Sequence, residues 1–204
     1  MTDLTLVVVA KDDASLDAFP RAHLSDVEFI GIVNYGGLSL AKIGNYFLSS
    51  TAARTVVGIC HADCTFGPGA LEAFTQAALD GAVCGIVGID LNRTYRWCHT
   101  KAPITHPDGV AENGPGEVST LDGCSVFLRR GSLLQFDEQA FDGFHCHVPD
   151  LCLQAHARNV PVIVPAAEAW HTGESTPEMA WQSDFQRYKK RLTEKWAGVR
   201  FETT

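Results

Sequence analysis

The sequence predicts an α/β fold with a mostly parallel sheet and helices on its faces. Short, continuous apolar runs of strand length recur along the first half of the chain, and segments with apolar residues about every 3.6 positions separate them. This alternation is typical of a parallel sheet whose connecting helices cover both faces. The 204 residues, 46% of them hydrophobic, are enough for one domain with a core of its own.

Four apolar runs are predicted to form the strands of the first half of the chain. None of them alternates between apolar and polar residues, so each strand is expected to be covered on both faces. The strands span 4–10, 27–33, 55–60 and 82–90. The helices predicted between them span 15–24, 38–48 and 68–79, with Ser39 as a cap of the second and Pro68 in the first turn of the third.

The second half of the chain is predicted to add strands at 118–129 and 160–164 around a helix at 148–158. In 179–196, aromatic and aliphatic residues recur at spacings of three and four, which predicts an amphipathic helix. We therefore expect 179–204 to be a C-terminal helix and tail of a single domain, 1–204. This helix either packs on its own domain or joins two copies in a homodimer.

A long irregular segment, 99–117, interrupts the pattern of elements. It holds three prolines and three glycines and shows no periodicity. A loop of this length inside a domain is usually a binding loop or lid, and the chain beyond it is too short for an independent core. We expect it, together with 172–178, to close over a bound ligand rather than to mark a domain boundary.

Composition excludes several classes of protein. The 16 Lys and Arg against 24 Asp and Glu give a net charge of −8, which repels a phosphate backbone and disfavours a nucleic-acid partner. Seven cysteines are an odd number, and no secretory leader precedes them, so a disulfide scaffold is not expected. No apolar stretch approaches the ~20 residues of a transmembrane segment. We expect a soluble, cytoplasmic protein.

Polar residues follow three of the predicted strands. The segment from Ala10 to Asp13 ends the first strand, Asn34 follows the second, and 61–64 follows the third. Ligands of parallel sheets bind at the carboxyl ends of the strands. Asp63 is placed there to bind a hard cation together with a nucleotide diphosphate, although an Asp that caps a turn is the alternative.

Two further polar residues stand at the ends of predicted elements. His171 follows a strand-like segment, and a neutral imidazole is a common ligand for ions of the Mn²⁺ class. Asp150 lies in the first turn of a predicted helix, where the dipole stabilises its anion and lets it accept a proton from a hydroxyl. A structural histidine and a helix-start aspartate are the corresponding alternatives.

A structural zinc site is a further alternative. His61-x-x-Cys64 with His145 and His147 offers four ligands, but there is no Cys-x-x-Cys pair, and the last two would point to opposite faces of an extended chain. No Walker loop, Gly-x-Gly-x-x-Gly after the first strand or Gly-x-Ser-x-Gly elbow occurs. This excludes P-loop NTPases, dinucleotide dehydrogenases and serine hydrolases.

The order of these features resembles the family 2-type glycosyltransferases, which have the GT-A fold, a Rossmann-like α/β arrangement. The resemblance covers most of the chain and rests on several short motifs in a fixed order. The motifs are VVGICHAD at 56–63, Asp122-Gly123 followed by Arg129-Arg130, Phe136-Asp137-Glu138, 141–155 with its DLCLQA, and Trp170-His171. Further matching positions are Asn34, 39–41, Asn45 and 192–196.

The resemblance implies an enzyme that transfers a sugar from a nucleotide-diphosphate donor to an acceptor hydroxyl, with inversion and with Mn²⁺ or Mg²⁺. Asp63 would contact the metal and diphosphate, His171 would be a further metal ligand, and Asp150 would be the catalytic base. The donor would be a UDP- or GDP-sugar, and the acceptor a glycan, a lipid-linked molecule or a protein. The residues implied to hold the nucleotide and donor sugar are Ala10, Asn34, His61, Ala62, Asp122 and Gly123.

The chain departs from the family pattern at two positions. His61 stands where the DxD-like triplet begins with Asp, and Pro149 stands where an acidic residue often precedes the base. The first departure favours an alternative function, a non-catalytic sugar-nucleotide-binding or assembly module of the same fold. A sugar nucleotidyltransferase is a third hypothesis, but 11–13 lacks the glycine-rich, basic signature that such enzymes usually have.

Overall fold

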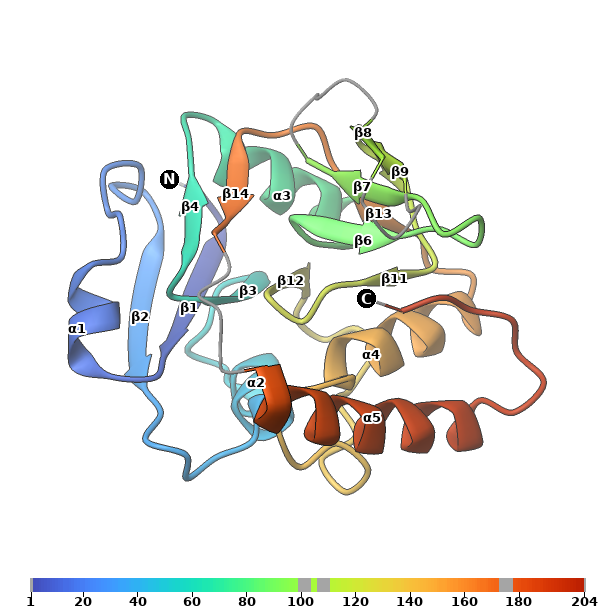
Figure 1. Cartoon of the computed structure of the whole chain (residues 1–204). Helices are drawn as coiled ribbons and strands as arrows, with labels where there is room; N and C mark the ends of the chain where they lie inside the picture. Colours follow the sequence, from blue (N-terminus) through green and yellow to red (C-terminus); the bar gives the residue numbers. More distant parts are fainter. Residues whose placement is uncertain (1, 99–103, 106–110, 173–177, 204) are drawn as a thin grey trace.

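Seven strands form the central sheet of the computed structural model, which describes residues 2–98, 104–105, 111–172 and 178–203 (Figure 1). In order across the sheet they are β10 (Gly116–Glu117), β13 (Val162–Val164), β5 (Val83–Cys84), β12 (Ser125–Arg129), β3 (Val56–His61), β1 (Leu4–Ala10) and β2 (Glu28–Val33). Only β10 and β12 run antiparallel to their neighbours. The prediction of a mostly parallel sheet is confirmed.

The strands β1, β2 and β3 coincide with the apolar runs predicted at 4–10, 27–33 and 55–60, to within a residue at each end. β1 lies between the other two and is parallel to both. All of its residues are buried. A strand with neighbours on both edges and cover on both faces has no position for a polar side chain facing water, which is why its sequence shows no alternation.

Two predicted strands, 82–90 and 118–129, are each divided between the central sheet and a second sheet. Gly85 explains this, because a Cβ at that position would lie 2.7 Å from the Ser125 carbonyl oxygen. The close approach of two backbones lets the chain leave one sheet for the other, so the prediction of two unbroken strands is wrong. The second sheet consists, in order, of β11 (Thr120–Leu121), β6 (Val87–Ile89), β7 (Tyr95–Trp97), β9 (Ala111–Asn113) and β8 (Ile104–Thr105).

Helices α2 (Leu40–Ser49) and α3 (Ala70–Leu79) cover opposite faces of the central sheet. On one face, Phe127 of β12 stacks on Phe74 of α3 with ring centroids 4.6 Å apart. Phe127 pairs with Gly58 of β3, and the next residue, Ile59, therefore points to the other face of the sheet. There it lies against α2. The crossover helices therefore lie on both faces, as the alternating pattern predicts.

Helix α1 (Asp13–Asp17) is shorter than the helix predicted at 15–24. Its N-terminus is capped by Asp12, whose carboxylate accepts a hydrogen bond from the Ser15 N–H at 2.7 Å. Pro20 limits its other end, because a proline ring disfavours the helical conformation of the residue before it. The predicted extent is therefore wrong, although the element exists.

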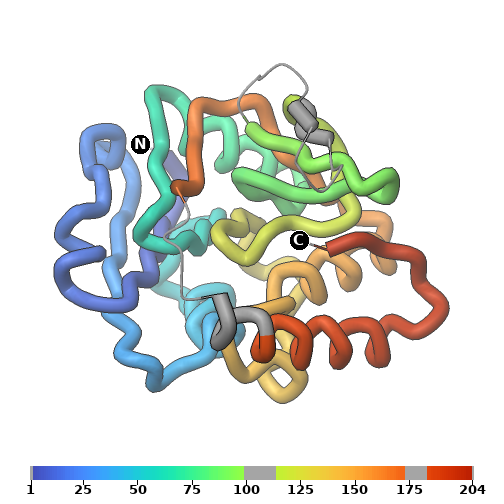
Figure 2. Tube along the Cα trace, viewed as in Figure 1, coloured from blue at the N-terminus to red at the C-terminus, as the bar shows by residue number. Residues whose placement is uncertain are grey.

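Helices α4 (His147–His156) and α5 (Glu178–Lys195) pack against each other, and Figure 2 shows the C-terminal helix alongside the segment that carries α4. The predicted C-terminal amphipathic helix therefore packs on its own domain. None of the helices in the described residues is long and apolar enough to cross a membrane. The buried side chains of this second, smaller core are Phe141, Cys146, Leu153, Tyr188 and Leu192.

Candidate functional site

The candidate site lies at the carboxyl ends of β1, β2 and β3. Ala10 ends β1, and its carbonyl accepts a hydrogen bond from the Asn34 N–H at 2.8 Å. Ala62, directly after β3, donates its N–H to the Val9 carbonyl at 3.1 Å. His61 is the last residue of β3. The strand ends that the sequence predicts to meet therefore lie side by side.

A two-stranded ladder brings His171 to Asp63. β4 (Cys64–Phe66) pairs antiparallel with β14 (Ala169–His171), and His171 lies opposite Cys64. The N–H of Thr172 extends the ladder by donating to the Asp63 carbonyl at 3.1 Å. The imidazole Nε2 of His171 then lies 3.1 Å from Asp63 Oδ2, and 22% and 21% of these side chains are exposed.

Two overlapping groups of potential metal ligands meet at this ladder. The donor atoms of His61, Asp63 and His171 all lie within 4.8 Å of one another, and so do those of Asp122, Cys124 and His171. His61 Nε2 is buried and has no hydrogen-bond partner among the described residues. An unpartnered buried nitrogen is unusual, because burial without a partner leaves the loss of hydration uncompensated. A ligand that binds this nitrogen would account for it.

The two imidazoles of the first group have opposite pKa shifts. Burial lowers the pKa of His61, and the carboxylates of Asp63 and Asp122 do not overcome this effect. Burial also lowers the pKa of His171, but the hydrogen bond to Asp63 and the contact with Cys124 outweigh it and raise the pKa to about 11. Without a bound cation, His171 is therefore protonated at neutral pH. A divalent ion would take the place of that proton beside Asp63.

The spacing of Asp63 and His171 fits a divalent cation. Two donors that bind one ion at right angles with bonds of about 2.1 Å lie about 3.0 Å apart. The measured separation of the two donor atoms is 3.1 Å. A carboxylate and an imidazole are together suitable ligands for Mn²⁺ and its neighbours in the first transition row.

Asn34 uses its side chain to hold a turn rather than to face a ligand. Its amide nitrogen donates to the Leu38 carbonyl at 2.8 Å, and its amide oxygen accepts from the N–H groups of Gly37 and Leu38 at 3.2 Å each. Only 8% of the residue is exposed. The nucleotide contact predicted for Asn34 can therefore come from its backbone but not from its side chain.

Asp122 and Gly123 lie in the turn between β11 and β12, next to the metal-ligand groups. The Asp122 carboxylate accepts a hydrogen bond from the Cys124 N–H at 2.8 Å. A Cβ at Gly123 would meet only ordinary contacts, the nearest being His147 Cε1 at 3.6 Å. The two residues predicted to lie near the donor sugar are thus on the same side of the sheet as Asp63 and His171.

Asp150, the predicted catalytic base, is enclosed by hydrogen-bond donors in this structure. Its side chain is fully buried, and both carboxylate oxygens accept hydrogen bonds. Oδ1 accepts from Lys195 Nζ and Trp196 Nε1 at 2.8 Å each, and Oδ2 accepts from Gln154 at 2.9 Å and Lys195 at 3.0 Å. In this conformation Asp150 joins α4 to the end of α5, and its role as the catalytic base stays a prediction.

His147 is a residue of the site whose position the sequence did not predict, since it entered only as a ligand in the zinc alternative. It is the first residue of α4, is 3% exposed and packs against Phe136. Burial lowers its pKa to about 3, so it is neutral, and its Nδ1 has no hydrogen-bond partner among the described residues. The dense polar and aromatic cluster at 141–150 was the available signal.

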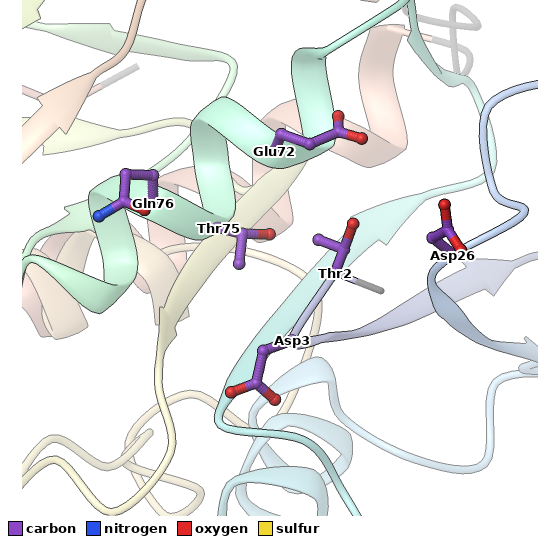
Figure 3. A pocket seen from close by; sticks show the side chains of 6 residues that line it. All are labelled: Thr2, Asp3, Asp26, Glu72, Thr75 and Gln76. Carbon is purple, nitrogen blue, oxygen red and sulfur yellow. The ribbon is translucent and has the colours of Figure 1, made fainter.

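A pocket of about 360 Å³ lies elsewhere, at the opposite end of the central sheet (Figure 3). It opens beside the start of β1 and the first turns of α3, and three carboxylates are among its lining groups. It therefore has no part in the strand-end site. Its lining residues are Thr2, Asp3, Asp26, Glu72, Thr75 and Gln76.

The two segments predicted to close over a ligand fall largely outside the described residues. These are 99–103 and 106–110 of the first segment, and 173–177 of the second. The flanking strands β8, β9 and β14 are described, and β14 leads directly from the candidate site into the second segment.

Comparison with known proteins adds structural relatives only. The sequence matches no protein-family model and no curated protein. The crystal structure of A197 from STIV aligns with a TM-score of 0.51 and 15% identity over 83% of this chain and 86% of that chain. GalNAc-T7, solved with UDP, GalNAc and Mn²⁺, aligns with a TM-score of 0.53 and 10% identity over 94% of this chain and 48% of that one. This chain thus spans about half the length of the GalNAc-T7 chain.

At these identities the likeness concerns the fold. The chain is a mixed α/β domain with a largely parallel central sheet flanked by helices, and this arrangement is similar to the GT-A glycosyltransferase fold. The fold class predicted from the sequence is therefore confirmed.

Proposed function

We propose that this protein transfers a sugar from a nucleotide-diphosphate donor to an acceptor hydroxyl with the help of a divalent cation. The pairing of Asp63, which follows the parallel strand β3, with His171, the last residue of β14, carries the proposal. The similarity in fold to GalNAc-T7, which was solved with UDP, GalNAc and Mn²⁺, supports it. A cation would also favour binding of a diphosphate to a chain whose net charge is −8, because a bound ion inverts the local field.

In this proposal, Asp63 and His171 hold the cation, and His61 lies within reach of the same ion. An ion held there would supply the positive charge that the diphosphate leaving group needs. The strand ends at Ala10 and Ala62 present backbone groups to the nucleoside. The turn at Gly123 would lie beside the sugar, because the absence of a side chain there lets the ligand approach the backbone, with His147 Cε1 3.6 Å from the position a Cβ would take. The chain thus positions the donor on a rigid sheet edge.

Inversion at the sugar carbon needs a group that accepts the proton of the acceptor hydroxyl. Asp150 reaches an acceptor only if Lys195 and Trp196 release it, because they fill its Oδ1. We therefore propose that Asp150 positions α4, and with it His147, beside the donor. A base role predicts that a stable Asp150→Asn protein loses turnover. A positioning role predicts a lower free energy of unfolding, with turnover falling only in proportion to the loss of folded protein.

The experiment is a donor hydrolysis and transfer assay with UDP- and GDP-sugars, with and without Mn²⁺. Turnover is expected to need the ion and to be lost in Asp63→Asn. The matched control is Asp26→Asn, an exposed carboxylate at the other end of the sheet, which should behave as the wild type. Ion-independent turnover, or turnover of Asp63→Asn at the wild-type rate, would contradict the proposal.

A second candidate function is a non-catalytic module that binds sugar nucleotides. The observation in its favour is the complete engagement of Asp150, which leaves the predicted base without access to an acceptor. Calorimetry with UDP and Mn²⁺, combined with the same turnover assay, separates the two functions. Ion-dependent binding of UDP without turnover over a broad panel of donors and acceptors would favour the binding module.

A further inference from the structure

His61 has an unexplained environment. It ends β3, its N–H donates to the Cys124 carbonyl at 2.9 Å, and its ring meets that of His171 edge-on with centroids 6.1 Å apart. Neither contact involves Nε2, which is buried and has no hydrogen-bond partner among the described residues. The nitrogen lies within 4.8 Å of the donor atoms of both Asp63 and His171. A third donor therefore faces the place where those two would hold an ion.

We propose that His61 is a third ligand of that ion, and that two imidazoles make the site selective for zinc-, cobalt- or iron-type divalent ions over Mg²⁺. The inference rests on the cation site of the proposed function. It goes further because it gives His61 a role that differs from contact with the nucleotide and because it names the class of metal.

The chemistry of the donor set separates the candidate ions. Mg²⁺ prefers oxygen ligands in a strict octahedron and gives up its water reluctantly. Imidazole suits zinc, copper, iron and nickel, and affinity for a nitrogen-containing site rises along the first transition row. Here two of the three donors are imidazole nitrogens and only Asp63 supplies oxygen. Such a site binds Mg²⁺ weakly and leaves further positions of a transition ion open to a ligand.

The competing set of Asp122, Cys124 and His171 shares one ligand with this site, so a single ion occupies one set or the other. The carboxylate of Asp122 already accepts a hydrogen bond from the Cys124 N–H at 2.8 Å. The Cys124 sulfur lies 3.9 Å from the Ser125 hydroxyl in a buried position. One Asp122 oxygen and the Cys124 sulfur have neighbouring polar groups, whereas His61 Nε2 is buried without a hydrogen-bond partner among the described residues. The His61 set is therefore the one we assign.

Co²⁺ titration of the metal-stripped full-length protein tests the assignment, because its visible absorption reports the ligands directly. We expect one Co²⁺ per chain and visible bands without a thiolate-to-cobalt charge-transfer band. A hundredfold excess of Mg²⁺ should not displace the Co²⁺, whereas Zn²⁺ should. His61→Gln is expected to weaken Co²⁺ binding by about 100-fold or more, because losing a group that only orients a metal ligand already costs about 10- to 100-fold.

Two variants control this result. His23→Gln removes an exposed histidine and should bind Co²⁺ as the wild type does. His61→Asp replaces nitrogen by oxygen and should shift the ratio of Mg²⁺ to Co²⁺ affinity towards Mg²⁺, which keeps the test informative if the glutamine variant folds poorly. Melting temperatures without metal show whether each variant is folded.

Three results would overturn the inference: no Co²⁺ bands in the wild type, a thiolate charge-transfer band, or wild-type Co²⁺ affinity in folded His61→Gln. Displacement of Co²⁺ by Mg²⁺ would overturn the selectivity. The proposed function and this inference can be contradicted independently of each other. A protein that binds Co²⁺ through His61 but turns over no sugar nucleotide keeps the inference and loses the function, and sugar transfer that needs Mg²⁺ and not His61 does the reverse.

Discussion

Two aspartates of this chain lie beside a basic side chain, but one of them is accessible to a ligand and the other is buried. Asp63 lies at a sheet edge with 21% of its side chain exposed and a histidine 3.1 Å away. Asp150 has no exposed side-chain surface, and Lys195 and Trp196 occupy one of its oxygens at 2.8 Å. The first pair is open to a ligand that can replace a proton. The second is a closed contact whose partners satisfy the buried charge.

The comparison shows that a carboxylate near the end of an element does chemistry only where the fold leaves it accessible. The sheet edge around Asp63 is formed by strand ends that stop together, so its polar groups face outward. Asp150 lies in the first turn of α4, where Lys195 at the end of α5 and the following Trp196 cover it. The end of α5 thus determines the difference between the two aspartates. Substitutions there should affect Asp150 and leave Asp63 unchanged.

The largest expected effect comes from Lys195→Met, which leaves the buried Asp150 charge without its cation. We expect the free energy of unfolding in urea to fall by about 3 kcal/mol, the lower end for a broken buried pair, because Trp196 still donates to the carboxylate. Lys190→Met, on the exposed side of the same helix, is the control and should change stability by less than about 0.5 kcal/mol. Equal effects of the two variants would refute the closed contact.

The second prediction concerns pH and the open pair. Because the pKa of His171 is raised to about 11 without a cation, the imidazole must lose a proton before it binds one. Affinity for Mn²⁺ or Co²⁺ should therefore rise about tenfold per pH unit, or about 100-fold between pH 6 and 8. Calorimetry at three pH values measures it, and an affinity that is independent of pH would show that His171 is not a ligand.

Trp196→Phe sharpens the comparison by removing one hydrogen bond from Asp150 while keeping an aromatic ring. The indole N–H donates to Oδ1 at 2.8 Å. Loss of a hydrogen bond to a buried charge should lower the free energy of unfolding by about 2 kcal/mol, less than Lys195→Met does. Metal affinity at the strand-end site should not change. A fall in metal affinity with unchanged stability would reverse the roles given to the two regions.

The smallest effect on stability is expected for Gly123→Ala. The added methyl group would lie 3.6 Å from His147 Cε1, an ordinary contact, so the free energy of unfolding should change by less than about 0.5 kcal/mol. The methyl group nevertheless narrows the space proposed for the sugar. Affinity for a UDP-sugar should fall while affinity for UDP stays the same, as paired titrations would show. Equal losses for both ligands would place the nucleoside, and not the sugar, beside Gly123.

Much of the fold could be predicted because its central strands are continuous apolar runs. Runs at 4–10, 27–33 and 55–60 have no competing periodicity, so their type and limits follow from local sequence. The division of 82–90 between two sheets could not be predicted. It depends on the contact of Gly85 with Ser125, two residues far apart in the chain.

Part of the candidate site could also be predicted from the sequence. The rule that ligands bind at the carboxyl ends of parallel strands was enough to place Asp63 after β3. His171 reaches it through the antiparallel ladder of β14 with β4, which the sequence did not predict. The engagement of Asp150 was not predictable, because Lys195 and Trp196 come from a helix whose packing partner no local pattern identifies. The buried nitrogens of His61 and His147 likewise depend on tertiary contacts.

Calorimetric titration of UDP in the presence and absence of Mn²⁺ tests the central claim most directly, with wild type, Asp63→Asn and the Asp26→Asn control. Binding of UDP by the wild type and the control should require Mn²⁺, and Asp63→Asn should bind no UDP under either condition. Binding of UDP with the same affinity with and without the ion, or undiminished binding by folded Asp63→Asn, would contradict the claim that this aspartate holds a cation for a nucleotide diphosphate.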